Sequence, residues 1–368
     1  MDKITILKKV NIVPFLEKLK KSFDVFLPVQ DKDKAVIEFM AADVLAEPND
    51  GKLSINLKEK TRKSPKSIFF PSSETLFEFE YLKDSKNPDI TDIRIDDKSV
   101  QKNGAPKQKL IFGLKPCDTK GIRSLDLVFN ESGKQDTYYS GKRDGSILIS
   151  IGCHIIFPDC FCPAVKGNPF DFEYSDIGFI DLGDFLAVLK ISEAGSAGKI
   201  LEDCGEYFED MDFDKNMSDK IEQIKSASME KFEGWVKNTD GLGSGSEMEK
   251  DFSNSEVWQK ISDKCVSCAA CTYVCPTCVC YSIGDETYNM NGERYRCWDF
   301  CTNYNYTLEA SGHNPRSRVF QRYRNKINCK FNYFYKRKKM LYCVGCGRCV
   351  EVCPVGMDIR DIIIGFSK

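Results

Sequence analysis

Two cysteine runs near the C-terminus constrain this chain more strongly than any other feature of its sequence. Each run has the spacing C-x2-C-x2-C-x3-C, and a proline follows its last cysteine. The members are Cys265, Cys268, Cys271 and Cys275 in the first run, and Cys343, Cys346, Cys349 and Cys353 in the second. With this spacing, three thiolates of a run bind one cubane iron–sulfur cluster and the fourth thiolate binds the neighbouring cluster.

We therefore predict two [4Fe–4S] clusters whose fourth ligands are exchanged between the runs. The predicted ligands are Cys265, Cys268, Cys271 and Cys353 for the first cluster, and Cys343, Cys346, Cys349 and Cys275 for the second. Zinc ribbons also use C-x2-C pairs, but two complete runs that each end in Cys-Pro favour iron–sulfur. A disulfide framework is disfavoured, because eighteen cysteines in a large chain without a predicted secretion signal belong in a reducing compartment.

Length and charge exclude several other classes of protein. The 368 residues are enough for two domains with separate cores. A net charge of −2 gives no overall sign of a nucleic-acid-binding protein. No apolar stretch approaches the roughly 20 residues of a membrane span, so we expect a cytoplasmic protein without a membrane span. Clusters of this kind are sensitive to oxygen, which favours an anaerobic setting.

The N-terminal half contains a pattern typical of a parallel β-sheet. Apolar strand patterns at 110–114 and 147–151 are separated by a predicted helix from Thr119 to Phe129. In such sheets, ligands bind beyond the carboxyl ends of the strands. Four cysteines follow these two strands, namely Cys117, Cys153, Cys160 and Cys162. They predict a third cluster, with a zinc site or a set of buried thiols as the alternatives.

The composition of one segment predicts where the boundary between two domains lies. The glycine- and serine-rich segment 238–246 is typical of a linker, which places a boundary near residue 245. We predict an α+β protein of two domains. Residues 1–245 would form an α/β domain that docks to a partner, and 246–368 a mainly helical ferredoxin-like domain with a helical insert at 276–342. The remaining cysteines are interpreted as packing thiols or as thiols beside the cluster ligands, and a further cluster built from some of them is the alternative. They are Cys204, Cys278, Cys280, Cys297, Cys301 and Cys329.

A basic segment lies within that insert. Residues 316–339 contain ten Lys or Arg and no acidic residue, with aromatic residues interleaved. Binding to nucleic acid is one interpretation. The favoured interpretation is electrostatic, because positive charge near an anionic cluster raises its reduction potential and a basic face suits an acidic redox partner.

Several short motifs resemble one known family over most of the chain. They are Ser64-Pro65-Lys66, Lys115-Pro116-Cys117-Asp118, Cys160-Phe161-Cys162, Cys275-Pro276-Thr277-Cys278, Gly312-His313-Asn314-Pro315-Arg316 and Gly345-Cys346-Gly347-Arg348-Cys349. With them the chain resembles the beta (iron–sulfur) subunit of soluble sulfhydrogenases and the corresponding iron–sulfur subunit of anaerobic sulfite reductase. The resemblance implies electron relay between a flavin subunit that binds NAD(P)H and a separate catalytic subunit, either a hydrogenase or sulfur reductase or a sulfite reductase.

The sequence contains no P-loop, nucleophile–base pair or metal-hydrolase motif. We therefore expect an electron-transfer subunit that is not catalytic alone. The alternative is a self-sufficient iron–sulfur reductase of a sulfur compound or disulfide, which a dye-linked assay of the chain alone would reveal.

Overall fold

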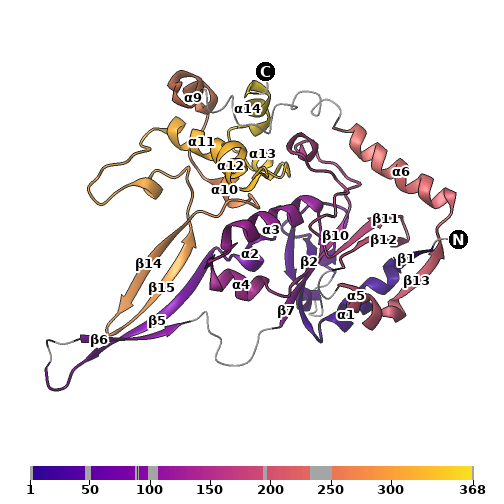
Figure 1. Ribbon diagram of the computed structural model, residues 1–368, viewed down its shortest axis with the longest axis horizontal. Coiled ribbons are helices and arrows are strands. Elements are labelled where there is room, and N and C mark those ends of the chain that lie inside the picture. The colour runs from indigo at the N-terminus through magenta and orange to yellow at the C-terminus, as the bar shows by residue number, and fades with distance from the viewer. Residues whose placement is uncertain are drawn as a thin grey trace.

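The computed structural model describes residues 3–45, 51–87, 89, 91–97, 107–193, 197–232 and 251–366. Figure 1 shows a central β-sheet flanked by helices, a long β-ribbon that projects to one side, and a group of C-terminal helices above the sheet. The fold is a mixed α/β structure, as predicted. The predicted boundary near residue 245 and the glycine-rich segment around it lie outside the described residues.

The main sheet has the strand order β13-β1-β12-β11-β10-β7-β2-β3, and β4 also pairs with β2. Its middle strands β11, β10, β7 and β2 run parallel, whereas the outer pairs are antiparallel. The strand bounds are β1 Lys3–Lys8, β2 Phe23–Asp31, β3 Val36–Ala41, β4 Leu53–Ile55, β7 Gln108–Leu114, β10 Ile147–Ile151, β11 Ile177–Asp181, β12 Phe185–Ile191 and β13 Phe208–Asp212.

The predicted strand–helix–strand unit is confirmed. Strands β7 and β10 are parallel neighbours, and helix α3 (Pro116–Phe129) connects them. The helix begins three residues earlier than predicted. Its first helical residue is Pro116, which suits the first turn, and the Lys115 amide donates to the Asp118 carboxylate. This early start places Cys117 in the first turn of the helix.

Helices cover both faces of the main sheet. One face packs against α1 and α5, and the opposite face packs against α2, α3 and α4. Alternate residues of the buried strands divide between the two faces, since Phe112 belongs to one core and Ile111 to the other. The helix bounds in this part are α1 Ile12–Leu19, α2 Lys66–Phe69, α4 Thr137–Arg143, α5 Ala197–Asp203 and α6 Lys215–Glu230.

The insert between the two cysteine runs is helical only in its second half. Its first half forms the hairpin of β14 (Tyr281–Tyr288) and β15 (Asn291–Trp298), and β15 pairs with β5 (Ser73–Lys83), which in turn pairs with β6 (Thr91–Asp97). The predicted helical insert at 276–342 therefore holds for its second half and is corrected for its first half, which is a β-hairpin. One reason is tertiary, because the buried Arg296 on β15 forms ion pairs with Glu74 of β5 and Asp136 beside α4.

The second half of the insert and the chain end form a third, mainly helical core. Trp258 is fully buried there, together with Ile327, Phe331 and Ile363. Several cysteines of the two runs pack against this core. The helix bounds are α9 Ser255–Ser262, α10 Ala270–Tyr273, α11 Val319–Asn328, α12 Phe334–Lys338, α13 Arg348–Glu351 and α14 Ile359–Phe366, with a π-helical turn at Cys329–Tyr333 between α11 and α12.

Candidate iron–sulfur centres

The two cysteine runs fold in the same way. In the first run, Ser267 and Ala269 flank the second cysteine and have φ values of 57° and 64°. In the second run, Gly345 and Gly347 occupy the same relative positions with φ values of 66° and 75°. A short helix follows each turn, α10 after the first and α13 after the second. The equal spacing in the sequence is thus matched by an equal backbone conformation.

In the second run, neighbouring residues leave no space for a side chain at positions 345 and 347, so both positions require glycine. A Cβ atom on Gly345 would lie 2.4 Å from the Cα atom of Cys162, and one on Gly347 would lie 2.3 Å from the Asp159 carboxylate. The amide of Phe161 donates to the Gly345 carbonyl at 2.8 Å. The second run therefore packs directly on the 159–162 loop of the N-terminal part.

The first predicted ligand set lines one cavity. Its cysteines are Cys265, Cys268, Cys271 and Cys353. Cys349 and Cys353 of the second run both line this cavity, so cysteines of the two runs meet there. Lys326 also lines this cavity, and its Nζ lies 2.6 Å from the Cys271 sulfur. Burial acts to lower the pKa of Lys326, but Cys271, Tyr323 and Cys349 raise that pKa well above its usual value.

The second predicted set also gathers in one place. Burial raises the pKa of Cys343 to about 12, and the proximity of Cys275 and Cys346 adds to this rise. Cys349 is half-buried and interacts electrostatically with Cys343, Cys346 and Cys275. Cys275 is the exception, since hydrogen bonding from Cys278 lowers its pKa well below the usual value, with help from Lys330. Lowering the pKa favours the thiolate, which is the form that binds metal.

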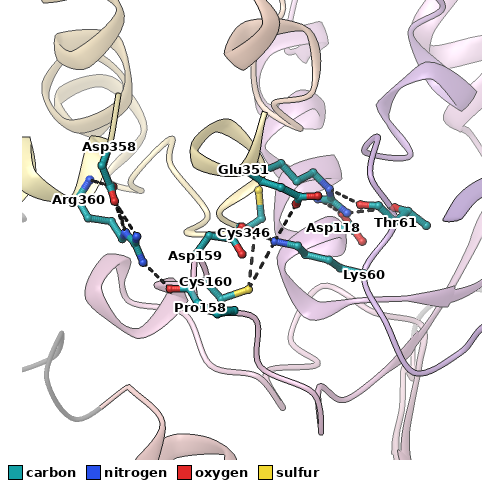
Figure 2. A network of polar contacts seen from close by, with 11 residues as sticks. Lys60, Thr61, Asp118, Pro158, Asp159, Cys160, Cys346, Glu351, Asp358 and Arg360 are labelled. Atoms are coloured by element: carbon teal, nitrogen blue, oxygen red, sulfur yellow. Dashed lines mark hydrogen bonds and ion pairs between the residues drawn. The ribbon is translucent and has the colours of Figure 1, made fainter. Parts of the chain in front are cut away.

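The four N-terminal cysteines line one cavity at the carboxyl edge of the parallel strands. They are Cys117, Cys153, Cys160 and Cys162. Lys60, Lys115 and Cys346 line the same cavity. Figure 2 shows the Lys60 ammonium between Asp159, Cys160 and Cys346, 3.9 Å from the Cys160 sulfur and 3.2 Å from the Cys346 carbonyl oxygen. The convergence predicted from the sheet is thus observed.

Burial and charge in these cavities suit an anionic metal cluster. Burial raises the pKa of Cys160 to about 11 and that of Cys162 well above its usual value, so these thiols ionise only with a strong partner such as a metal. Within the described ranges, no three His, Cys, Asp or Glu side chains surround a point in the manner of a single metal ion. A cubane core holds four thiolates further apart than one tetrahedral ion does.

Comparison with known proteins identifies the family. A profile for a 4Fe-4S dicluster domain matches residues 264–357, which include both runs. The beta subunit of sulfhydrogenase 2 from Pyrococcus furiosus is 31% identical over 298 residues, and these cover 80% of each chain. The chain belongs to this sulfhydrogenase beta-subunit family. It is an iron–sulfur electron-transfer subunit with [4Fe–4S] clusters, which confirms the resemblance found in its motifs.

In this sulfhydrogenase-type subunit, a buried arginine ties the second run to the main sheet. Arg348 is completely buried and forms a 2.7 Å ion pair with Asp118 in the first turn of α3. Its Nε also donates to the Thr61 carbonyl at 2.8 Å. Figure 2 labels its two partners, Asp118 and Thr61, close to Lys60. The link holds α3, and with it Cys117, at a fixed position relative to Cys346 and Cys349.

The basic segment at residues 316–339 of this chain contains both buried and exposed side chains. Lys326 and Lys330 are 5% and 3% exposed and lie beside cysteines. Exposed residues of the same segment include Arg318, Lys336, Arg337 and Lys339. The buried pair supports the electrostatic interpretation of this segment. No helix in the described part of the chain is both long and apolar enough to cross a bilayer.

The structure groups further cysteines that sequence reasoning did not assign. Cys278, Cys280, Cys301 and Cys329 interact electrostatically with one another, whereas the favoured prediction gave them a packing role or a place beside the cluster ligands. Their spacing in the chain matches no motif, so the runs alone gave no reason to combine them. The one available signal was their number, because a packing role does not require so many cysteines within one segment.

Proposed function

We propose that this chain relays electrons between a flavin subunit that binds NAD(P)H and a separate catalytic subunit of a cytoplasmic complex in an anaerobic cell. The catalytic subunit would be a hydrogenase or sulfur reductase, or a sulfite reductase. Membership of the sulfhydrogenase beta-subunit family supports the relay role. The name of the relative favours the hydrogenase and sulfur branch over the sulfite branch.

The observation that best supports a relay is the contact between the thiol sets. Cys349 belongs to the second set and also lines the cavity of the first set. Cys346 belongs to the second set and also lines the cavity of the N-terminal set. The second set therefore lies between the other two. Groups arranged in this order suit transfer across the chain rather than chemistry at one isolated site.

The cysteines fit the proposed cofactors. Cys265, Cys268, Cys271 and Cys353 would hold one [4Fe–4S] cluster; Cys343, Cys346, Cys349 and Cys275 would hold the second; and Cys117, Cys153, Cys160 and Cys162 would hold a third. Such clusters accept and release one electron at a time when bound. Buried cations beside each set, such as Lys326, Lys330 and Lys60, compensate the negative charge of the thiolates.

The chain's surface offers a place for a partner. Exposed basic residues near the end of α12 form a positive rim next to the C-terminal core, including Lys336, Arg337 and Lys339. A basic rim attracts an acidic redox partner and orients it on approach. We infer that one partner subunit docks on this side and that the other docks on the N-terminal α/β part.

Anaerobic affinity purification of the chain from its native host tests the relay proposal. We expect a flavin subunit and a catalytic subunit to copurify, and mass spectrometry would identify the reaction from the latter. Recovery of the chain alone, together with turnover of polysulfide, sulfite or a disulfide from a reduced dye, would instead support the self-sufficient reductase.

Iron analysis tests the N-terminal cluster separately. Replacement of both Cys117 and Cys160 by alanine should remove about four irons and four sulfides per chain, because each would lose a thiolate of the same cavity. The matched control is Cys204→Ala, a buried cysteine in the core beneath α1 that belongs to no thiol set. An iron content equal to that of the control would exclude the third cluster.

A further inference from the structure

The hairpin β14–β15 brings two distant cysteine-bearing segments together. Cys280 directly precedes β14, and Cys301 follows β15 by three residues. The strands pair in register from Tyr281 opposite Trp298, and the Asp299 amide donates to the Cys280 carbonyl at 3.0 Å. Closing the hairpin thus places Cys301 beside Cys280. The two thiols lie close enough to shift each other's pKa, that of Cys280 downward and that of Cys301 upward.

Two more cysteines complete the group. Cys278 lies close enough to Cys301 for an electrostatic interaction between their sulfurs, and Cys329 interacts in the same way with both Cys280 and Cys301. The four come from three separate segments of the chain, the loop before β14, the turn after β15 and the end of α11. All four are free thiols, and Cys301 is buried.

Cys329 is the first residue of a π-helical turn at Cys329–Tyr333, between α11 and α12. Such turns are rare, are less favourable than an α-helix, and occur frequently at functional sites. The next residue, Lys330, is buried, and its Nζ donates to the Thr277 hydroxyl at 2.7 Å. The irregular turn therefore brings both a thiol and a cation to the same group of cysteines.

Buried positive charge at the group lacks a carboxylate partner. Lys330 and Lys66 are 3% and 1% exposed, and in the described ranges neither has an acidic side chain within ion-pair distance. Lys66 donates to the Cys278 carbonyl at 2.8 Å. Two buried ammonium groups are costly without a compensating anion. Thiolates and a cluster bound to them would supply that anion.

A buried hydroxyl at the group also lacks a partner. The Tyr342 hydroxyl oxygen makes no hydrogen bond within the described part of the chain. Its ring lies under the Lys330 ammonium, 4.4 Å from Nζ, and its phenol interacts electrostatically with Cys329 and Cys278. An unpartnered buried donor requires an explanation, and a bound inorganic group with acceptor atoms provides one.

We propose that Cys278, Cys280, Cys301 and Cys329 bind a further iron–sulfur cluster of the [4Fe–4S] type, next to the second ligand set. Each thiol releases its proton to solvent as its sulfur binds iron, and the charge of the resulting site is balanced by Lys330 and Lys66. The site adjoins the second set through Cys275, because the Cys278 amide donates to the Cys275 carbonyl at 3.4 Å.

Metal and sulfide analysis of the complete chain, purified without oxygen, tests this site. The double variant Cys301→Ala with Cys329→Ala should lose about four irons and about four sulfides relative to the parent chain. The matched control is Cys297→Ala, which lies on β15 of the same hairpin, opposite Ser73 and Ser282, and outside the group. The control should retain the parent's iron. Equal iron contents in the variant and the control would overturn the proposal.

Two alternatives predict different readouts. Loss of one zinc ion in place of iron would overturn the proposal in favour of a zinc site. A disulfide between Cys280 and Cys301 in the parent, found by mass spectrometry of the non-reduced protein, would overturn it in favour of a redox-active thiol pair. The iron lost by the double variant does not depend on whether the N-terminal cluster exists, because the variant leaves Cys117, Cys153, Cys160 and Cys162 unchanged.

A second, milder variant tests the same site in case the double variant fails to fold. Cys329→Ser keeps the size of the side chain and an oxygen that can bind iron, so the chain should retain most of its iron. We expect its low-temperature EPR spectrum after reduction to differ from that of the parent, while Cys297→Ser leaves the spectrum unchanged. A Cys329→Ser spectrum identical to that of the parent would contradict the assignment of this residue as a ligand.

Discussion

Replacement of Lys326 by methionine should lower the reduction potential of the centre held by the first run. The Lys326 Nζ is 2.6 Å from the Cys271 sulfur, and the residue is 5% exposed. Methionine keeps most of the packed side chain and removes the charge. Because the reduced centre has one more negative charge than the oxidised centre, loss of the ammonium destabilises the reduced form more.

The size of the effect follows from Coulomb's law. For an effective dielectric constant of about 20 and roughly 6–8 Å between the ammonium and the centre of the added charge, the interaction is worth about 2–3 kcal/mol. A one-electron couple shifts by about 59 mV for a tenfold change in its equilibrium constant, so the potential should fall by about 90–120 mV. Loss of the charged hydrogen bond to Cys271 acts in the same direction.

An anaerobic redox titration followed by EPR measures this shift in the complete chain. The control is Lys264→Met, because Lys264 is exposed and directly precedes Cys265. Water and salt screen its charge, so the control should shift the potential by less than about 30 mV. A Lys326→Met shift no larger than that of the control would refute the reasoning, since Lys326 would then not act as a buried charge at this centre.

Three other predictions follow from the same contacts. Cys353→Ala should remove the cluster of the first run before that of the second, and EPR showing early loss of the second-run signal would contradict the exchanged ligands. Arg348→Met leaves Asp118 buried without its partner and should destabilise the chain by about 3–5 kcal/mol in anaerobic urea unfolding, whereas Arg294→Met, which breaks an exposed pair, should leave the unfolding midpoint nearly unchanged. Similar costs for both would show that Arg348 is not paired as described. Removal of iron by a chelator should raise the rate of amide hydrogen exchange in 265–275 and 343–353 and leave β10 protected, because the thiols pack against the helical core. Equal increases in exchange across the whole chain would contradict this prediction.

The parts predicted correctly from sequence depend on local patterns. The buried strand at 147–151 was predicted at its observed bounds, and β7 and α3 were predicted to within a few residues, because apolar runs and turn residues mark them. The rule that ligands bind at the carboxyl ends of parallel strands then brought Cys117 and Cys153 together correctly. The spacing of the runs predicts that Cys353 joins the first run, and Cys353 lines the cavity of the first run together with Cys349.

The parts that sequence reasoning missed depend on contacts between distant segments. Strand β15 forms beside β5 although more than 200 residues separate them, and no local pattern in 276–342 reveals that partner. The burial of Lys326 and Lys330 was likewise not predicted, because a lysine-rich segment is usually exposed. The grouping of Cys280 with Cys301 depends on that same unpredicted hairpin.

The shared four-strand ribbon also limits how this chain can be divided by protein engineering. Strands β14 and β15 follow the first cysteine run, yet β15 has β5 from the N-terminal part along its other edge. A truncated protein that begins near residue 251 would leave that edge open, with unpaired backbone groups available to another chain. Such a fragment should aggregate, and a fusion of residues 251–366 to an unrelated carrier protein should aggregate for the same reason. The cysteine-rich region therefore cannot be transferred to another protein as an independent domain, even though its motifs occupy one contiguous stretch of sequence.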